Sequence, residues 1–521
     1  MSTIRDALLA RAEDAHPALL AGDDRWSWQE YVEQCARRAN ALGDILGPAR
    51  PPHVGLLMDN TPEMAFQLGS AGLGTHVAVG LNTTRRGAAL GADIRKADCQ
   101  VVVADERLVP LLDGVNLGGV RVLRSNDPDW SEQLAGASTV VPDATPEPGS
   151  LFMLIFTSGT SGDPKAVRIT HEKVTFPGAY LTERLGLGRD DVCYVSMPLF
   201  HSNAVMAGWG PALTCGATVA LAERFSAGRL VDDLRRYGAT YMNYVGKPLS
   251  YVLATPPRPD DRDNPLRIAF GNEAGDRDVQ AFAERFDCTV VDGFGSTENA
   301  VVVSRVPGTP PGSLGVPLEG VAVLDPETNE ECPPAVFDES GRVVNLREAT
   351  GELVNTSGTG QFAGYYNDEA ATAERMRGGM YWSGDLAYRD EAGFVYYAGR
   401  TADWLRVDGE NLAAEPIERI LGRHPSIGQV AVYGVPDPSS GDQLVAALVL
   451  VNDLAPDELE RFLAAQPDLG PKQWPRFVRI MDQLPRTASN KVLKRELRAD
   501  GIGGDGSVWT RSERGTSYLA G

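Results

Sequence analysis

The chain has 521 residues and a formal net charge of −21, from 49 basic and 70 acidic side chains. This excess disfavours nonspecific binding to nucleic acid or to an anionic membrane surface, but it allows local basic sites for phosphate. No apolar run approaches the ~18 residues of a membrane span, and the six cysteines are scattered without a C-x-x-C pair. We therefore expect a cytoplasmic protein with reduced thiols.

Helical and extended patterns alternate in the first quarter of the chain. Apolar residues at helical spacing predict helices over 27–46 and 61–74, the second with a Thr at its start and a Pro beside it. A short apolar run predicts a strand over 53–59. The alternation resumes beyond residue 190, so the sequence predicts an α/β sheet architecture.

The apolar segment 151–155 leads into FTSGTSGDPK, residues 156–165. An apolar run that ends in a Gly/Ser/Thr cluster predicts a buried strand followed by a tight loop. Glycines let backbone N–H groups approach an anion, hydroxyls add donors and a lysine adds charge, as a nucleotide triphosphate requires. The spacing excludes a Walker A loop, and a solvated turn is the structural alternative. The candidate phosphate-binding residues are Thr157, Ser158, Gly159, Thr160, Ser161, Gly162 and Lys165.

A second candidate site lies in residues 291–300, VDGFGSTENA, where a strand leads into a Gly-rich turn. Phe294 has an aromatic ring that can stack on a base. Glu298 has a carboxylate, which is a hard oxygen ligand suited to a Mg²⁺ ion that bridges phosphates. The alternative interpretation is a β-turn with a surface glutamate.

A third candidate site combines Asp385, in the sequence SGDL, with Arg400, which closes the predicted strand FVYYAG. A carboxylate can accept hydrogen bonds from both vicinal hydroxyls of a ribose, and an arginine can reinforce it. Taken singly, the two residues also fit a turn aspartate and a surface arginine.

The pattern changes near residue 400, where a strand passes through a charged turn into a helix. A compact unit of about 100 residues follows, which is a usual domain size. We place a domain boundary at Asp403, with an N-terminal domain over 1–402 and a C-terminal domain over 403–500. Residues 501–521 are rich in Gly and Ser, and we expect a flexible tail there.

In chain order, these segments resemble the adenylate-forming superfamily, which includes acyl-CoA synthetases, adenylation domains of peptide synthetases and luciferases. TSGTSGDPK resembles its phosphate loop, GFGSTE its YGxTE motif, and SGDL with GRTAD its GDL and GRxxD signatures. Residues 484–497 resemble its PRTxxGKxxR motif, with Lys491 at the lysine. The resemblance extends through most of the chain and is strongest to bacterial fatty-acid-transport-protein-like acyl-CoA synthetases. The chain departs from the family's usual residues at Ala166, Glu273 and Asn490.

The resemblance implies an α/β fold with two main parts. The first is a large N-terminal domain of α/β subdomains plus a distorted β-barrel, and the second is a small mobile α+β C-terminal domain. It implies that Asp403 is the hinge about which the small domain rotates. It also implies that the protein uses ATP, Mg²⁺ and CoA.

The same resemblance assigns roles around the nucleotide. Residues 270–275 border the adenine, Asp385 binds the ribose with help from Arg400, and Glu298 and Thr160 hold the metal. The implied nucleotide-binding residues outside the phosphate loop are Asn272, Glu273, Ala274, Asp292, Gly293, Phe294, Gly295, Ser296, Thr297, Asp385, Tyr397 and Arg400. The implied catalytic residues are Lys491, Glu298, Thr160 and Gly409.

Two aromatic-rich segments, 198–210 and 241–257, correspond to the family's acyl-binding tunnel, although core packing is the simpler explanation for most of their residues. Gly409 would let the pantetheine arm of CoA pass close to the backbone. Residues 194–203 contain no acidic side chain for an amino group, which disfavours an amino-acid substrate. The implied acyl- and CoA-binding residues are His201, Met206, Tyr244, Val245, Gly246, Arg406, Gly409 and Glu410.

The implied activity is a two-step acyl-CoA ligase reaction on a medium, long or bulky apolar acid, with an aryl acid as an alternative substrate. The carboxylate attacks the α-phosphorus of ATP, Lys491 stabilises the developing charge, and CoA then displaces AMP. Two alternatives share every nucleotide motif: transfer of the acyl group to a carrier protein in trans, or a single half-reaction that depends on a partner. The presence of Lys491 counts against a non-enzymatic nucleotide sensor or lipid-binding protein.

Overall fold

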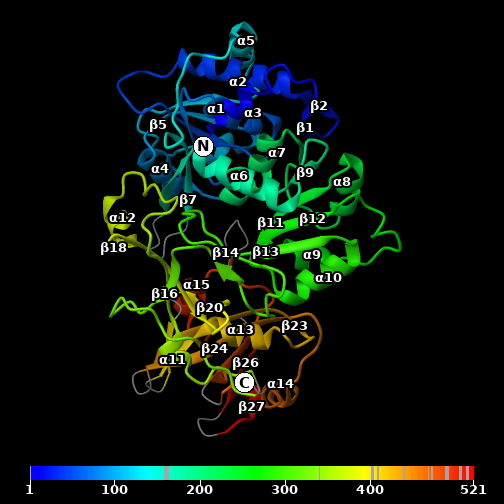
Figure 1. Ribbon diagram of the computed structural model, residues 1–521, viewed down its shortest axis with the longest axis vertical. Helices are drawn as coiled ribbons and strands as arrows, with labels where there is room; N and C mark the ends of the chain where they lie inside the picture. The colour runs from blue at the N-terminus through cyan, green and yellow to red at the C-terminus, as the bar shows by residue number, and fades with distance from the viewer. Residues whose placement is uncertain are drawn as a thin grey trace. The chain divides into compact units, whose positions relative to one another are not determined.

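The chain forms two compact units, residues 1–299 with 361–374 and residues 300–360 with 375–521. Figure 1 draws both units as ribbons and labels a part of their helices and strands. Among the residues that the structure describes, no helix is long and apolar enough to cross a membrane. The computed structural model describes residues 2–157, 164–339, 341–400, 404–407, 410–437, 441–466, 469–470, 473–486, 492–503, 507–511 and 515–520.

The first unit contains a seven-stranded sheet in the order β13-β12-β11-β9-β10-β1-β2. Its neighbouring strands are parallel, except that β2 runs antiparallel to β1. Parallel strands are covered on both faces, which explains their nearly continuous apolar sequences. The strands are β1 (Pro17–Ala21), β2 (Asp24–Ser27), β9 (Val192–Val195), β10 (Thr218–Leu221), β11 (Tyr241–Val245), β12 (Ile268–Asn272) and β13 (Thr289–Gly293).

A second sheet of the same unit has the order β6-β5-β3-β4-β7-β8, and again one edge strand, β8, is antiparallel to its neighbour. The β7–β8 hairpin brackets the predicted phosphate loop. The strands are β3 (His53–Leu57), β4 (Val77–Gly80), β5 (Cys99–Ala104), β6 (Arg121–Arg124), β7 (Leu151–Thr157) and β8 (Lys165–Thr170).

Two helices of the first unit begin at the side-chain caps that the sequence supplies. Ser27 and Glu30 form a capping box at the start of α2, and Thr61 caps α3 with Pro62 next to it, as predicted. The helices are α1 (Ile4–Leu9), α2 (Trp28–Gly43), α3 (Pro62–Gly72), α4 (Gly87–Lys96), the 3₁₀ helix η1 (Glu106–Leu112), α5 (Pro128–Gly136), α6 (Glu172–Leu185), the π-helix η2 (Ala204–Trp209), α7 (Gly210–Cys215), α8 (Leu230–Tyr237), α9 (Pro248–Leu253), α10 (Asp276–Phe286) and α12 (Glu369–Arg375).

One apolar cluster supports the part of the first sheet that carries the candidate site. Met242 and Tyr244 of β11 are buried with Phe282 and Phe286 of α10. Figure 1 shows α9 and α10 alongside β11, β12 and β13. Because side chains alternate along a strand, Tyr241 faces the opposite side, where its hydroxyl donates to a backbone carbonyl of η2 at 2.6 Å.

The second unit begins with antiparallel structure. Four strands pair in the order β16-β17-β19-β18, β20 pairs with β19, and β14 pairs with β15. The elements are β14 (Val303–Ser304), β15 (Val316–Pro317), β16 (Val321–Leu324), α11 (Leu346–Ala349), β17 (Gly351–Asn355), β18 (Met376–Arg377), β19 (Met380–Arg389) and β20 (Val395–Arg400).

The rest of the second unit is an α+β body around one further sheet. The sheet order is β22-β21-β24-β25-β26-β27, with β23 paired to β24. The elements are β21 (Trp404–Val407), β22 (Glu410–Ala413), α13 (Ala414–Leu421), β23 (Ile427–Asp437), β24 (Gly441–Leu450), α14 (Pro456–Ala464), β25 (Phe477–Ile480), α15 (Lys494–Asp500), β26 (Val508–Arg511) and β27 (Tyr518–Ala520).

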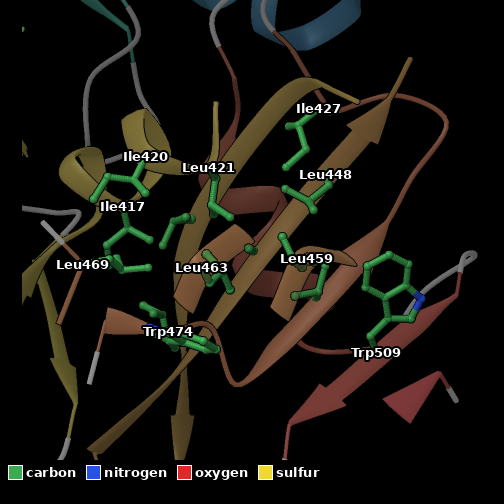
Figure 2. Close-up of a cluster of buried hydrophobic side chains, with 14 of the residues drawn as sticks. Ile417, Ile420, Leu421, Ile427, Leu448, Leu459, Leu463, Leu469, Trp474 and Trp509 are labelled. Carbon is green, nitrogen blue, oxygen red and sulfur yellow. The ribbon is translucent and has the colours of Figure 1, made fainter. Parts of the chain in front are cut away.

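The C-terminal residues differ from the expected flexible tail. Strand β26 pairs with β25, and β27 pairs with β26. Figure 2 shows Trp509 of β26 in the same apolar cluster as Ile417 of α13 and Leu459 of α14. Trp509 and Tyr518 are both buried. Burial of two aromatic rings outweighs the Gly/Ser content that favoured a tail, because such rings account for several kcal/mol of stability each, on the order of 3–5 when one is truncated.

The predicted α/β architecture and the separate α+β C-terminal body are confirmed. The predicted boundary and hinge, Asp403, lies outside the described residues and stays a prediction. The six cysteines are free thiols.

Candidate active site

Most candidate residues of the first unit follow the ends of neighbouring parallel strands. Val245 of β11 pairs with Asn272 of β12, which pairs with Gly293 of β13. The three segments that continue from these residues therefore start side by side at one sheet edge. In open α/β sheets, ligands bind outside the carboxyl ends of the strands, so this edge is where a nucleotide is expected.

The segments that are implied to border the adenine are tied to each other. The Tyr244 hydroxyl donates to Asp292 Oδ2 at 2.8 Å, and the Ala274 backbone N–H donates to the same oxygen at 3.2 Å. Asn272 Nδ2 donates to the Gly295 carbonyl at 3.5 Å. Asp292 is buried, so its hydrogen bonds hold the start of both segments.

Glu273, which departs from the family's usual residue, has a strained backbone. Its backbone has a φ of 67°, which lies in the left-handed region. A residue with a Cβ adopts this conformation at a cost of about 1–2 kcal/mol, whereas glycine does so freely. The residue type at position 273 therefore did not predict the strained backbone at the edge of the predicted nucleotide site.

Glu298, the predicted metal ligand, is held by a residue that had no predicted role. The Tyr365 hydroxyl donates to Glu298 Oε1 at 2.8 Å. The ammonium of Lys165 lies 5.2 Å from the centroid of the Tyr365 ring and 3.3 Å from Glu374 Oε2. Lys165 is buried, whereas the Glu374 side chain is 69% exposed. The structure thus brings together a predicted carboxylate and a predicted cation.

The frame of the phosphate loop is defined at both of its ends. Thr157 and Lys165 pair across the β7–β8 hairpin, and the Thr157 hydroxyl donates to the Lys165 carbonyl at 3.5 Å. Thr297, next to Glu298, shares a hydrogen bond of 2.9 Å with the Ser202 hydroxyl. The turn at 294–298 is therefore joined to the segment that leads into η2.

The predicted acyl-site residues lie in the segment that leads into η2, in η2 itself and in or directly after β11. Burial lowers the pKa of His201 to about 4, and its Nε2 has no hydrogen-bond partner among the described residues. His201 is consequently uncharged at neutral pH. Met206 lies in η2 and is buried, while Tyr244 faces the α10 side through its ring and Gly246 follows β11 with a φ of 69°.

The two predicted ribose-binding side chains, Asp385 and Arg400, meet Tyr397, another predicted nucleotide-binding residue, in the second unit. Asp385 and Arg400 pair across β19 and β20. Arg400 Nε lies 3.2 Å from Asp385 Oδ1, and the Tyr397 hydroxyl donates to the same oxygen at 3.3 Å. Asp385 is buried. The carboxylate is therefore fixed in one orientation before any ligand arrives.

Several predicted residues fall outside the described part of the chain, and their roles stay predictions. They include the proposed catalytic lysine and most of the phosphate loop. The residues are Ser158, Gly159, Thr160, Ser161, Gly162, Asp403, Gly409 and Lys491, together with the side chains of Arg406 and Glu410.

Sequence reasoning missed three residues around Glu298 and Lys165: Tyr365 and Lys173, which interact with Glu298, and Glu374, which pairs with Lys165. Lys173 lies in α6 and is fully buried, and its Nζ has no hydrogen-bond partner within the described residues. Burial lowers the pKa of Lys173 to about 7, although the negative charge of Glu298 acts in the opposite direction. A lysine at a helix position that faces the core was the available signal for Lys173, whereas the sequence GYYND, residues 364–368, gave no indication that Tyr365 contacts Glu298.

Two family models match this chain. The AMP-binding enzyme model matches residues 8–366, and the AMP-binding enzyme C-terminal domain model matches residues 416–491. The first covers both strand-end segments and the phosphate loop, and it ends at the residue after Tyr365.

Curated relatives match nearly the whole chain. The medium/long-chain-fatty-acid–CoA ligase FadD17 of Mycobacterium marinum is 52% identical, over 97% of this chain and 98% of that protein. The steroid-22-oyl-CoA synthetase of Rhodococcus jostii is 46% identical, over 95% of this chain and 91% of that protein.

Solved structures share the fold. ATP-bound MatB from Rhodopseudomonas palustris aligns with a TM-score of 0.82 at 22% identity, over 96% of this chain and 99% of that chain. A benzoate CoA ligase from Burkholderia xenovorans aligns with a TM-score of 0.80 at 23% identity, over 96% and 100%. The family models and the curated relatives confirm the predicted superfamily: the chain belongs to the AMP-binding enzyme family.

Proposed function

We propose that this chain is an ATP-dependent ligase that activates a medium-chain, long-chain or bulky apolar carboxylic acid as an acyl-adenylate and transfers the acyl group to CoA. The ligase class predicted from the sequence is confirmed by full-length relatives at 52% and 46% identity. The observation that carries the finer proposal is the cluster at the strand ends. The carboxylate of Glu298, which is suited to bind a metal ion, and the ammonium of Lys165, which is suited to bind a phosphate, both contact Tyr365.

Glu298 and the hydroxyl of Thr160 would hold Mg²⁺. Carboxylate and hydroxyl oxygens suit this ion, which usually binds through one or two carboxylates together with substrate phosphates. When bound, it neutralises charge on the phosphates that leave. Lys165 contributes a further positive charge from the start of β8. Glu374, which contacts Lys165 here, is mostly exposed and can be displaced by an incoming phosphate.

The carboxyl group of the substrate then attacks the α-phosphorus, forming its P–O bond as the bond to pyrophosphate breaks. Lys491 is proposed to stabilise the charge that develops on the oxygens. Asp385, with its orientation set by Arg400 and Tyr397, accepts hydrogen bonds from the ribose hydroxyls. In the second step the CoA thiol attacks the acyl carbonyl and AMP leaves, after rotation at Asp403 brings Arg406, Gly409 and Glu410 to the site.

The proposed acid is large and apolar for two reasons. His201 is uncharged at neutral pH, and Met206 of η2 is buried, so neither predicted acyl-site residue favours a charged tail on the acid. The relatives' names specify medium- or long-chain fatty acids and a steroid acid, which share this property.

The free cysteines fit the proposed cytoplasmic location.

The test is a mass-spectrometric screen of carboxylic acids with ATP, Mg²⁺ and CoA that reads acyl-AMP and acyl-CoA separately. Fatty or polycyclic acids are expected to give acyl-CoA with release of AMP. Acyl-AMP without acyl-CoA would contradict CoA as the acceptor and indicate a carrier protein. Turnover only of synthetic acyl-AMP would contradict the adenylation step.

A further inference from the structure

We infer that Tyr365 is a positioning residue of the ATP site: its hydroxyl orients the carboxylate of Glu298 and its ring seats the ammonium of Lys165. One side chain would then set the spacing between the metal-binding carboxylate and the phosphate-binding cation. This inference rests on the proposed function, because it gives Tyr365 a task in the binding of ATP with Mg²⁺.

The backbone places Tyr365 beside β8, directly after the phosphate loop. The Tyr366 N–H donates to the Ala166 carbonyl at 2.8 Å, and the Arg168 N–H donates to the Gly364 carbonyl at 3.2 Å. Between these hydrogen bonds, Val167 and Tyr365 form an antiparallel bridge. The segment therefore lies along β8 as a short additional strand.

The side chain of Tyr365 is fixed as firmly as its backbone. The residue is 5% exposed, and the ring of Phe362 packs edge-on against it at 5.0 Å between centroids. The Tyr365 N–H donates to the hydroxyl of Thr372 at 3.0 Å, which joins the segment to α12. A ring held in this way presents its hydroxyl to Glu298 and its face to Lys165 with little freedom to move.

The two contacts have different physical functions. A hydrogen bond to a charged carboxylate is directional, so it limits the rotation of Glu298 and orients its oxygens. Outer partners of this kind typically change metal affinity by about 10–100-fold when they are removed. The face of a tyrosine attracts a cation within about 6 Å of the ring centre, so the ring stabilises the position of Lys165.

Two substitutions separate these functions. Tyr365→Phe removes the hydroxyl but keeps the ring beneath Lys165. Tyr365→Leu removes both. Tyr366→Phe is the matched control, because the hydroxyl of this adjacent tyrosine donates to a different carboxylate, Asp98 Oδ2, at 2.9 Å and outside the proposed site.

The experiment measures ATP binding to the purified full chain by calorimetry, without acid or CoA, over a series of Mg²⁺ concentrations. Tyr365→Phe is expected to raise the Mg²⁺ concentration for half-maximal ATP binding roughly tenfold, while metal-free ATP affinity stays near that of the unaltered chain. Tyr365→Leu should also weaken metal-free binding. Tyr366→Phe should match the unaltered chain in both measurements.

An unchanged Mg²⁺ dependence in Tyr365→Phe would overturn the inference, and so would an equal shift in Tyr365→Phe and Tyr366→Phe, which would indicate a structural role only. The proposed function fails in a different way, since the unaltered chain would then not bind ATP with Mg²⁺ at all. Thermal melting of each variant shows whether it is folded, and a melted Tyr365→Leu leaves the Phe comparison intact.

Discussion

Two carboxylates in this molecule have closely similar neighbours but a different balance of charge. Glu298 in the first unit accepts a hydrogen bond from Tyr365 at 2.8 Å, and Asp385 in the second accepts one from Tyr397 at 3.3 Å. Asp385 is also paired with Arg400 at 3.2 Å. Glu298 has no ion-pair partner within the described residues, although the buried Lys173 responds to its charge.

This difference matches the ligands that each carboxylate is proposed to bind. The charge of Asp385 is already balanced, so it is suited to neutral hydroxyl groups such as those of a ribose. Among the described residues no cation pairs directly with the carboxylate of Glu298, so Glu298 is suited to a divalent cation and the phosphates around it. A tyrosine orients the carboxylate at both sites, whereas within the described part of the chain a paired cation accompanies Asp385 alone of the two and distinguishes the ligand that each is proposed to bind.

Substitution of Glu298 should have the largest effect. Glu298→Gln keeps the size of the side chain and an acceptor for Tyr365 but removes the negative charge. We expect acyl-AMP formation to fall by about 10²–10³-fold, the range found when one group that stabilises transition-state charge is removed. Mass spectrometry of acyl-AMP in reactions without CoA measures this loss. Thioester formation from synthetic acyl-AMP is the control, and an equal loss there would contradict the assigned role.

Substitution of Lys173 should change stability rather than chemistry. Burial lowers the pKa of Lys173 from 10.5 to about 7 in the folded chain. Between these pH values the folded state binds fewer protons than the unfolded state, so the free energy of unfolding rises with pH across this window. One pKa unit corresponds to about 1.4 kcal/mol, which bounds the penalty below pH 7 at about 5 kcal/mol.

Lys173→Met removes this buried ammonium and should raise the free energy of unfolding at pH 6.5 by about 2–3 kcal/mol, within the range of about 1–4 kcal/mol found when buried ionic groups are replaced by apolar residues of similar volume. Urea unfolding at pH 6.5 and pH 9 measures the difference, which should shrink at the higher pH. Lys96→Met is the control, since Lys96 is paired with Asp368 at 2.9 Å and should lose stability or stay unchanged. A gain that is independent of pH would contradict the charge explanation.

The contrast between the two carboxylates also shows what could be predicted from the sequence. Asp385, Tyr397 and Arg400 lie on two consecutive strands, so hairpin pairing alone brings them together. The strand ends at Asn272 and Gly293 were likewise predictable, because parallel strands end at the same sheet edge. The positions of these residues follow from the pairing of neighbouring strands, which the sequence pattern predicts.

Other contacts depend on tertiary structure that no local pattern reveals. Tyr365 reaches Glu298 only because the segment after residue 360 returns to β8, although most of the intervening residues belong to the second unit. The buried position of Trp509 follows from strand pairing, against the Gly/Ser content that predicted a flexible tail. The left-handed backbone of Glu273 could not be predicted from the sequence, because glutamate rarely adopts this conformation.

Substitution of Asp385 tests the balanced carboxylate. Asp385→Asn removes the charge that pairs with Arg400 and weakens acceptance from both ribose hydroxyls, so the KM for ATP should rise about tenfold. Steady-state kinetics with ATP and with 2′,3′-dideoxy-ATP measure the effect. The unaltered chain should discriminate strongly between the two nucleotides and the variant weakly. Equal discrimination by both proteins would place the ribose elsewhere.

The smallest effect should come from Tyr397→Phe, which tests whether the tyrosine contributes equally to the function of Asp385 and of Glu298. Asp385 loses one hydrogen bond but keeps its contact with Arg400 at 3.2 Å, so its orientation and charge balance persist. We expect the KM for ATP to rise only about two- to threefold, at the low end of what one hydrogen bond contributes. Tyr365→Phe removes the hydrogen bond that Glu298 accepts from within the described residues, so it should change the Mg²⁺ dependence of ATP binding by a larger factor. If Tyr397→Phe proves as costly as Tyr365→Phe, the tyrosines rather than the neighbouring cations set the behaviour of both carboxylates.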